Sequence, residues 1–324
     1  MKIKKLIYRM FPGIVEKYIT TKNNKKKVDD IELMIKNDEK KYRETYGLAF
    51  NIKQPTTFYE KISFLKYYGN VDNAHLLVDK IKVKEILEQG GDSEKTAKII
   101  AVFYSFNAFK KGVRMVSEEH KHFVLKLNHT SGGVWFYHNG GYYDKFGERV
   151  SKRFVFACLK QRINFEYFKL HYERVYKSVK PAILLEEYLP SPKNKGLDEY
   201  KFFCAYGKPV LVNVIYGRQE GKRVKEAFTD IELNVYPVWQ TQNILDQNEI
   251  YQPSSYKEMI DFCGKYCKDY PFVRVDLMVC GDTFRFCEFT FYDCAGINVF
   301  YPVEWNKKMG DLIPGNVLGE KCNE

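Results

Sequence analysis

Two short segments near the C-terminal end of the chain alternate apolar and polar side chains, and together they predict the strands of a β-hairpin. They are residues 273–277 (Val-Arg-Val-Asp-Leu) and residues 287–291 (Cys-Glu-Phe-Thr-Phe). Successive side chains along a strand point to opposite faces of the sheet. The apolar set, Cys287 included, is therefore expected in a core, and the polar set on the other face.

The register of this hairpin decides which polar side chains lie opposite each other. A loop with an odd number of residues, such as Gly281–Thr283, pairs Asp276 with Glu288. Directly opposed Cβ atoms are only ~5 Å apart, so two like charges there need a cation between them. Mg²⁺ accepts one or two carboxylates and completes its shell with substrate phosphates. The pair predicts a magnesium site, the alternative being two solvated acids on a surface hairpin.

The same register pairs Arg274 with Thr290 and places both on the face of the two carboxylates. The polar face of the predicted hairpin thus combines a cation, a hydroxyl and two acids.

Composition excludes several classes of protein. The chain has 324 residues, of which 16% are aromatic, which argues against disorder and allows two or three lobes. No apolar run approaches the ~20 residues of a membrane span, and no secretion signal is evident. Eight cysteines without a Cys-x-x-Cys spacing are typical of reduced cytosolic thiols. We therefore expect a cytoplasmic protein.

Most of the net positive charge belongs to the N-terminal segment. Residues 1–27 carry nine Lys/Arg and one Glu, a net +8 out of the +11 of the whole chain. Basic and apolar residues interleave there in a pattern typical of a helix that binds an anionic membrane surface or a partner. Pro12 would interrupt this helix unless it opens a second one. A solvated basic tail is the alternative, and no reader motif supports nucleic-acid binding.

Periodic patterns along the rest of the chain predict an α+β architecture with mostly antiparallel strands. The expected helices are residues 29–46, one that opens at Thr57 with a capping box to Glu60, and residues 76–87, 153–178 and 256–267. The expected strands are residues 98–104, 123–128, 182–188, and a hairpin of 200–205 with 210–215.

A lysine followed by a glycine-rich turn marks residues 122–133 as a second informative segment. Lys126 lies in the middle of the expected strand, and lysine is a point charge suited to phosphate oxygens. The turn Ser131-Gly132-Gly133 would let backbone N–H groups approach an anion closely. The order of residues is not that of a P-loop. The segment predicts a flap over nucleotide phosphates, or else an edge-strand lysine with an ordinary turn.

Several charged residues give weaker signals of the same kind of site. Glu186 and Glu187 end an apolar strand and could accept from an adenine amine, and Glu199 could bind ribose hydroxyls. Lys80 belongs to a lysine-rich helix start. Arg218 follows a strand, where it could hold an anionic substrate. For each of them, ordinary surface charge is the default interpretation.

Taken in order, these segments resemble the ATP-grasp superfamily and, within it, the TupA-like branch associated with teichuronopeptide biosynthesis. The matched pattern runs from about Thr56 to Pro314. Its most specific pieces are residues 58–62, 78–80, 123–133, 186–189, 199–203 with 207–209, and 274–276 with 288–292. Their order and spacing together are more specific than any one of them.

The resemblance implies an ATP-grasp fold, with two α+β lobes clamping ATP behind a helical N-terminal extension, and ATP and Mg²⁺ as cofactors. The implied nucleotide contacts are Lys80, Lys126, Ser131, Gly132, Gly133, Glu186, Glu187, Tyr188, Leu189, Glu199 and Lys201. Among them the two lysines would contact phosphates, the serine and glycines would form a flexible loop, Glu186 to Leu189 would bind adenine, and Glu199 would bind ribose.

The resemblance also implies the chemical centre. The implied metal ligands are Asp276, Glu288 and Thr290, the last standing where many ATP-grasp ligases have asparagine. Arg274, with backbone N–H groups near Gly296, would stabilise charge at the acyl centre. Lys126 and Arg218 complete the implied catalytic set.

The implied activity is ADP-forming carboxylate–amine ligation through an acyl phosphate. In this branch the expected product joins an amino acid or peptide to a sugar acid of a bacterial surface polysaccharide, such as a capsule, O-antigen or teichuronic polymer. Such polymers are assembled on lipid carriers, so the enzyme is expected at the inner face of the cell membrane. The alternatives are a glycosyltransferase of the same pathway, with a Rossmann-like parallel core, and a non-catalytic nucleotide-binding protein.

The expected organisation has four regions. They are a basic amphipathic arm at residues 1–27, a helical N-terminal region at 28–120, a small ATP-grasp lobe with the glycine-rich flap at 121–189, and a C-terminal catalytic lobe at 190–324.

Overall fold

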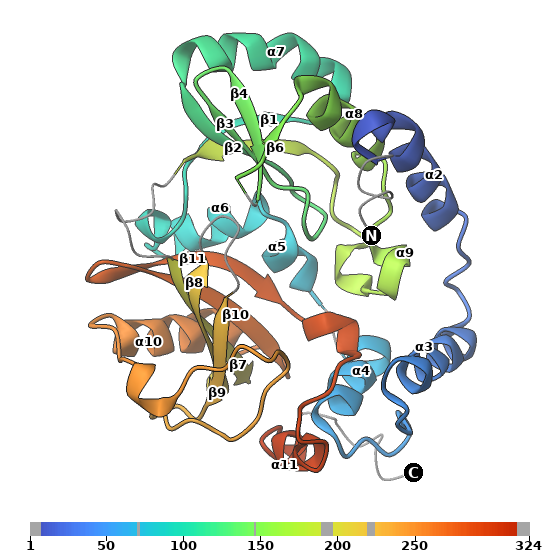
Figure 1. Cartoon of the computed structure of the whole chain (residues 1–324), viewed down its shortest axis with the longest axis vertical. Coiled ribbons are helices and arrows are strands. Elements are labelled where there is room, and N and C mark those ends of the chain that lie inside the picture. Colours follow the sequence, from blue (N-terminus) through green and yellow to red (C-terminus); the bar gives the residue numbers. More distant parts are fainter. Residues whose placement is uncertain (1–7, 70–71, 146, 189–196, 219–223, 316–324) are drawn as a thin grey trace. The chain divides into compact units, whose positions relative to one another are not determined.

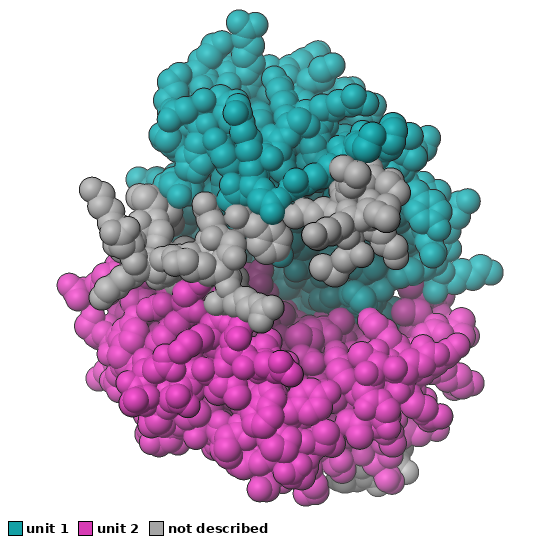
Figure 2. Space-filling model, viewed as in Figure 1, with its two compact units in different colours: residues 1–27, 73–190 teal, residues 28–72, 191–324 magenta. Residues whose placement is uncertain are grey.

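The computed structural model describes residues 8–69, 72–145, 147–188, 197–218 and 224–315. The chain forms two compact units, each built on one antiparallel sheet (Figures 1 and 2). Unit 1 comprises residues 1–27 and 73–190, and unit 2 comprises residues 28–72 and 191–324. The mixed α+β class expected from the sequence is confirmed. The four functional regions expected from the sequence remain a prediction.

Unit 1 is built on a six-stranded sheet with helices packed on one of its faces. The strands lie in the order β1 (Ile99–Phe103), β6 (Ile183–Glu187), β2 (His122–Leu127), β3 (Trp135–His138), β4 (Gly141–Asp144) and β5 (Arg149–Val150). Helices α7 (Phe106–Glu119) and α8 (Lys152–Arg162) share a hydrophobic core with this sheet (Figure 1). Leu125 of β2 is fully buried in this core. Because side chains alternate along a strand, Lys126 lies on the opposite face.

The helix expected at residues 76–87 is divided in two. The structure has α5 (Ala74–Val78) and α6 (Lys82–Gln89). Between them, the Asp79 side chain accepts a hydrogen bond from the Ile81 backbone N–H at 2.9 Å. An aspartate that binds its neighbouring backbone offers the chain an alternative to helix, which explains the break.

The aromatic stretch at residues 153–178 is also not one helix. It forms α8, then α9 (Phe168–His171), then a 3₁₀ turn at Arg174–Tyr176. Tyr172 ends α9 with a φ of 60°, and a left-handed residue cannot continue a right-handed helix.

The N-terminal segment belongs to unit 1. Helix α2 (Pro12–Asn24) begins at the proline, as the sequence analysis allowed, because proline at the first helical position loses no intrahelical hydrogen bond. It packs against α8. Among the described helices, none combines the length and the apolar character that crossing a membrane would require.

Unit 2 is built on a five-stranded sheet. The strands lie in the order β11 (Thr283–Thr290), β10 (Val273–Cys280), β7 (Leu197–Ala205), β8 (Lys208–Arg218) and β9 (Lys225–Thr229). Helix α10 (Tyr256–Cys267) packs against β7, β8 and β10, and it has the bounds that the sequence predicts. Its Phe262 stacks with Phe289 of β11 at a ring distance of 6.4 Å. The remaining helices are α3 (Ile31–Tyr46), α4 (Phe58–Tyr68) and α11 (Trp305–Asp311).

The pairing expected in the β10–β11 hairpin is confirmed, although the loop is different. Asp276 pairs with Glu288. The turn holds two residues, Gly281 and Asp282, because Cys280 pairs with Thr283. The odd residue is Cys287, which lies in a bulge where the register shifts.

The bulge also corrects the expected position of Cys287. An extra residue in one strand shifts the alternation of its side chains on either side. Cys287 is consequently half-buried, whereas Phe284, Phe286 and Phe289 of the same strand are buried. All seven cysteines of the described residues are free thiols.

Helix α4 is buried almost along its whole length and anchors unit 2. Thr57 and Glu60 form the predicted capping box. Two lysines of α4 are buried with their charges satisfied internally: Lys61 donates to the carbonyl oxygen of Gly310 at 2.8 Å, and Lys66 is ion-paired with Asp38. These contacts bind α4 to α11 and to α3.

Replacing Gly310 with alanine is expected to destabilise the protein by about 1–3 kcal/mol, since overpacking that moves backbone has an effect of this size. A Cβ atom there would clash with the carbonyl oxygen of Thr56 and approach Phe58 N to 2.9 Å. Urea unfolding measures the loss. The matched control is Gly315→Ala, whose Cβ meets nothing within 4 Å. Equal stability of the two variants would contradict this packing.

Candidate active site

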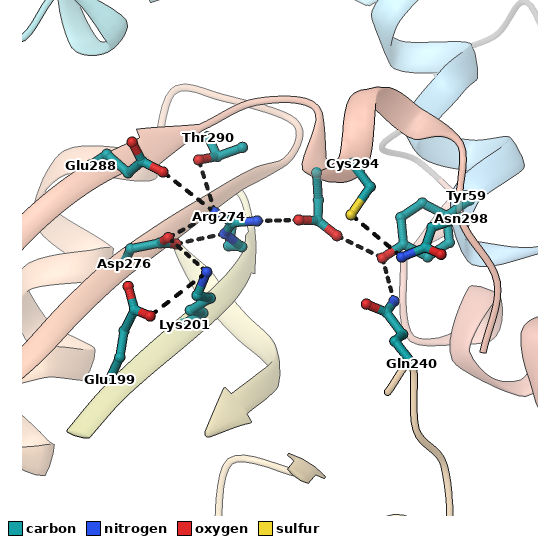
Figure 3. A network of polar contacts seen from close by, with 11 residues as sticks. Tyr59, Glu199, Lys201, Gln240, Arg274, Asp276, Glu288, Thr290, Cys294 and Asn298 are labelled. Carbon is teal, nitrogen blue, oxygen red and sulfur yellow. Dashed lines mark hydrogen bonds and ion pairs between the residues drawn. The ribbon is translucent and has the colours of Figure 1, made fainter. Parts of the chain in front are cut away.

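Arg274 is the centre of a buried polar network in unit 2 (Figure 3). Its guanidinium binds both oxygens of Asp276, with Nε to Oδ1 at 2.6 Å and Nη2 to Oδ2 at 2.7 Å. It also donates to Asp293 and, at 3.2 Å, to the Thr290 hydroxyl. Glu288 lies farther away, with one oxygen 3.7 Å from Nη2. One side chain thus connects three of the residues predicted from the hairpin pattern.

The sheet explains why these side chains meet. Arg274 and Asp276 are two residues apart on β10 and so share a face. Thr290 and Glu288 lie directly opposite them on β11. On the other side of β10, Lys201 of β7 pairs with Asp276.

Lys201 extends the network to β7. Its ammonium lies 3.2 Å from Asp276 Oδ2 and 3.8 Å from Glu199 Oε2. The structure therefore brings together six of the predicted site residues, all on three neighbouring strands. They are Glu199, Lys201, Arg274, Asp276, Glu288 and Thr290.

The charges in this network are strongly coupled. Burial alone would raise the pKa of Asp276, but Arg274 and Lys201 outweigh it and hold that pKa below its usual value. Burial opposes the charge of Arg274, yet Asp276 and Asp293 raise its pKa well above normal. Both groups are accordingly ionised at neutral pH.

The oxygen-rich composition of the network fits a magnesium ion. Four carboxylates face two cations, an excess of two negative charges when all are ionised. Glu288 lies opposite Asp276, and its side chain is 41% exposed. Among the described residues, no group of three or more His, Cys, Asp or Glu side chains is arranged to hold a metal. Mg²⁺ does not need a third such ligand, because it ordinarily binds one or two carboxylates together with substrate phosphates. Asp276 and Glu288 therefore fit it.

Three residues to which the sequence analysis assigned no role, Asp293, Tyr59 and Gln240, extend the network to α4. The Tyr59 hydroxyl donates to Asp293 Oδ2 at 2.6 Å, and the Gln240 amide donates to Tyr59 at 2.5 Å. Burial, followed by the charge of Asp293, raises the pKa of Tyr59 well above its usual value. The tyrosine therefore stays a proton donor. One signal for Asp293 was available, since it is an acid directly after an apolar aromatic segment.

A left-handed turn follows Asp293. Cys294, Ala295 and Gly296 have φ angles of 49°, 58° and 74°, and such residues persist only where the surroundings impose them. Helix α4 does so here: the Ser63 hydroxyl donates to Gly296 O at 2.8 Å, and Lys66 donates to Ala295 O at 2.8 Å.

The turn presents polar side chains beside the Arg274 network. Cys294 is exposed, and the Asn298 amide contacts its sulfur at 3.4 Å. Tyr46 of α3 donates to Asn298 Oδ1 at 3.1 Å. Cys294, Asn298 and Gln240 lie near Tyr59 in Figure 3.

A second charged cluster lies in unit 1, on the face of the sheet opposite its core. The buried carboxylate of Glu186 forms ion pairs with Lys126 at 2.6 Å and with Lys84 at 2.9 Å. Burial would raise the pKa of Glu186, but the two lysines outweigh it and lower that pKa. The sequence analysis named Lys80 in this lysine-rich stretch and not Lys84, whose side chain is mostly buried, at 12% exposed.

The glycine-rich turn of unit 1 is joined to the predicted Lys80. The ammonium of Lys80 donates to the carbonyl oxygen of Thr130 at 2.8 Å. Gly132 and Gly133 have φ angles of 74° and 67°, which only glycine adopts readily. Ser131, at the tip, is exposed. The structure therefore places the Lys80 ammonium beside the glycine-rich turn.

The remaining predicted residues are less informative. Glu187 accepts a hydrogen bond from Lys98 N at 3.0 Å, and the Tyr188 ring packs edge-on against His138 at 4.6 Å. Leu189 lies outside the described residues, as does the side chain of Arg218. The functional roles of all these residues remain predictions.

His129, beside the glycine-rich turn, is expected to make stability depend on pH. Burial, helped by the charge of Lys80, lowers its pKa to about 4. The unfolded chain, with a pKa near 6.5, binds the proton more tightly, so stability is full above that pH and falls toward pH 4. We expect a loss of about 2 kcal/mol between pH 7 and pH 5. Urea unfolding of wild type and His129→Gln measures it, and an equal pH dependence of the two would contradict it.

Comparison with known proteins gives the family. A family model described as TupA-like ATP-grasp matches residues 60–314. No curated protein matches the sequence at a significant level.

Solved structures are only distantly similar. D-alanine–D-alanine ligase from Bacillus anthracis, complexed with ATP, is 17% identical with a TM-score of 0.39; the match covers 77% of this chain and 67% of that one. The corresponding ligase from Helicobacter pylori is 12% identical with a TM-score of 0.39, over 79% and 68%. The ATP-grasp ligase PsnB, complexed with its minimal precursor, is 11% identical with a TM-score of 0.34, over 68% and 54%.

These distant structures carry no argument about substrates, but the family model covers most of the chain. ATP-grasp ligases typically form C–N bonds with ATP and use Mg²⁺. With its two antiparallel sheets and the matched residues 60–314, the chain belongs to the TupA-like ATP-grasp family.

Proposed function

We propose that the protein is an ADP-forming carboxylate–amine ligase that makes an amide through an acyl phosphate. The observation that carries this proposal is the Arg274 network, in which Asp276 and Glu288 lie opposite each other beside a buried, fully ionised arginine. Family membership supplies the reaction class. The network supplies groups suited to a phosphoryl and acyl centre.

Asp276 and Glu288 are the proposed magnesium ligands, and the Thr290 hydroxyl is close enough to assist. Mg²⁺ bound there would neutralise charge on the phosphate oxygens. Lys201 and Arg274 keep Asp276 ionised, as a ligand must be. Glu199, on the same face of the sheet, is the proposed partner of the ribose hydroxyls.

The lysines of unit 1 are the proposed phosphate contacts. Lys126 and Lys84 are held side by side by Glu186, and Lys80 is held at the glycine-rich turn. Lysine ammonium groups suit phosphate oxygens as point charges. Glu186, with the backbone from Glu187 to Leu189, remains the proposed adenine contact.

The proposed reaction has two steps. A substrate carboxylate oxygen attacks the γ-phosphorus of ATP, so that an O–P bond forms and the bond to ADP breaks. An amine then attacks the acyl carbon, the C–O bond to phosphate breaks, and the nitrogen loses a proton. Arg274, oriented by Asp276 and Asp293, would stabilise the negative charge that develops on the acyl oxygen.

A sugar acid is the proposed carboxylate, with an amino acid or peptide as the amine. Gln240, Asn298 and Tyr46 support this choice, since amide and phenol groups that adjoin Tyr59 and the turn at Cys294 suit a substrate with many hydroxyls. The polymer would be a bacterial surface polysaccharide, and its lipid-linked assembly would place the enzyme in the cytoplasm at the inner face of the membrane.

Hydroxylamine trapping tests the reaction class. With ATP, Mg²⁺ and a panel of uronic acids, the ligase should release ADP and form a hydroxamate from the acyl phosphate. Glycosyl transfer from a UDP-sugar without ADP formation would favour the alternative, a glycosyltransferase of the same pathway.

A further inference from the structure

Helix α2 turns its apolar side chains toward solvent. Ile14 is 70% exposed and Tyr18 is 65% exposed, and side chains four residues apart lie above one another on a helix. Phe11, directly before the helix, is 49% exposed, and Met10 is 56% exposed. The described part of this segment therefore carries a stripe of large apolar groups on its outer side.

The inner side of α2 is polar, which is the reverse of an ordinary surface helix. Glu16 is 1% exposed, and both of its oxygens bind Arg162 of α8, at 2.6 and 2.8 Å. Asn23 is also buried and donates to the carbonyl oxygen of Glu166 at 2.8 Å. The ion pair and hydrogen bonds hold α2 on unit 1 through its polar residues, while Ile14 and Tyr18 stay exposed.

The charged side chains on the outer side of α2 are all basic. Glu16 is the only acidic residue among residues 1–27, and it is sequestered against Arg162. Lys17 and Lys22 are exposed and flank the Ile14–Tyr18 stripe. Arg9 is neutralised by its ion pair with Glu148.

We infer that α2 docks unit 1 on an anionic lipid surface through the outward stripe of Phe11, Ile14 and Tyr18 and the lysines that flank it. Apolar groups set between basic ones match the acyl boundary and the negative headgroups of such a surface. Tyrosine and phenylalanine suit the interface itself. The inference adds a partner to the proposed function and does not depend on its chemistry.

Vesicle co-sedimentation of the full chain tests this inference. The probes are phosphatidylcholine vesicles with and without phosphatidylglycerol. Wild type should bind the anionic vesicles, and binding should weaken as salt is added, because the lysines are exposed to screening. Ile14→Ser/Tyr18→Ser and Lys17→Gln/Lys22→Gln should each weaken binding by about tenfold or more.

Helix α7 of the same unit provides matched controls. Met115 is 61% exposed, and Lys110 and Lys111 are exposed as well. Met115→Ser and Lys110→Gln/Lys111→Gln should bind vesicles like wild type. Circular dichroism checks that each variant is folded.

The inference is overturned if wild type ignores anionic vesicles, as it would if α2 served a protein partner, or if the α2 and α7 variants bind equally. The stabilisation by Mg-ATP is measured on the same samples. Retained ATP binding with lost vesicle binding in the α2 variants supports the lipid surface. If wild type shows no stabilisation by Mg-ATP, that result counts against the proposed ligase and leaves the vesicle result standing.

Discussion

Replacing Arg274 with methionine should lower the free energy of unfolding by about 3–5 kcal/mol, the usual result of breaking a buried ion pair from one side. Its removal leaves Asp293 buried without the guanidinium that binds it, and leaves Asp276 with Lys201 as its remaining cation. Urea unfolding at neutral pH measures this loss. Because Arg274 also faces the proposed acyl centre, ADP formation should fall as well.

Two further variants separate this explanation from a general sensitivity to substitution. Arg114→Met removes an arginine that is 87% exposed and is paired along its own helix with Glu118, and it should change stability by less than about 0.5 kcal/mol. Adding Asp276→Asn and Asp293→Asn to Arg274→Met should recover much of the lost stability, since no buried charge then lacks a partner. A loss of under about 1 kcal/mol in the single variant would contradict the buried network.

Glu288→Gln should lower the rate of ADP formation on the order of 100-fold and leave stability nearly unchanged, because the amide is a much weaker magnesium ligand. Glu288 is 41% exposed, and its ion pair with Arg274 is long, at 3.7 Å, so little folding energy depends on it. Rates measured over a series of Mg²⁺ concentrations should show partial recovery at high Mg²⁺.

The matched control is Glu232→Gln, another exposed glutamate of unit 2, which should keep the wild-type rate. A Glu288→Gln enzyme with wild-type activity at low Mg²⁺ would remove this residue from the metal site. A loss of stability large enough to explain the loss of activity would instead indicate a structural role for Glu288.

The sequence was most informative where chemistry and local pattern coincide. Alternation in residues 273–277 and 287–291 predicted which side chains share a face, and the Asp276–Glu288 pairing followed. The predicted three-residue loop was wrong. The extra residue is instead in a bulge at Cys287, which no local sequence pattern indicates. The Thr57–Glu60 capping box was predictable because all its atoms lie within one helical turn.

Contacts between distant segments could not be predicted in this way. Tyr59 meets Asp293 across 234 positions of sequence, and periodicity alone gives no reason to join them. Nothing in the local sequence distinguishes Lys84 from the other lysines around it, and only the fold places it against Glu186 of another element. The polar inner side of α2 could not be predicted for the same reason, because the partner of Glu16 is Arg162 in α8.

Thermal stability with Mg-ATP is the most direct test of the central claim that this chain has a working ATP-grasp centre. Melting of wild type and Glu288→Gln is compared with ATP alone, Mg-ATP, Mg-ADP and a set of UDP-sugars. The account predicts a magnesium-dependent stabilisation by ATP, about 2.7 kcal/mol at a hundredfold excess over Kd, which is much reduced in Glu288→Gln. Stabilisation by a UDP-sugar and none by Mg-ATP would contradict it.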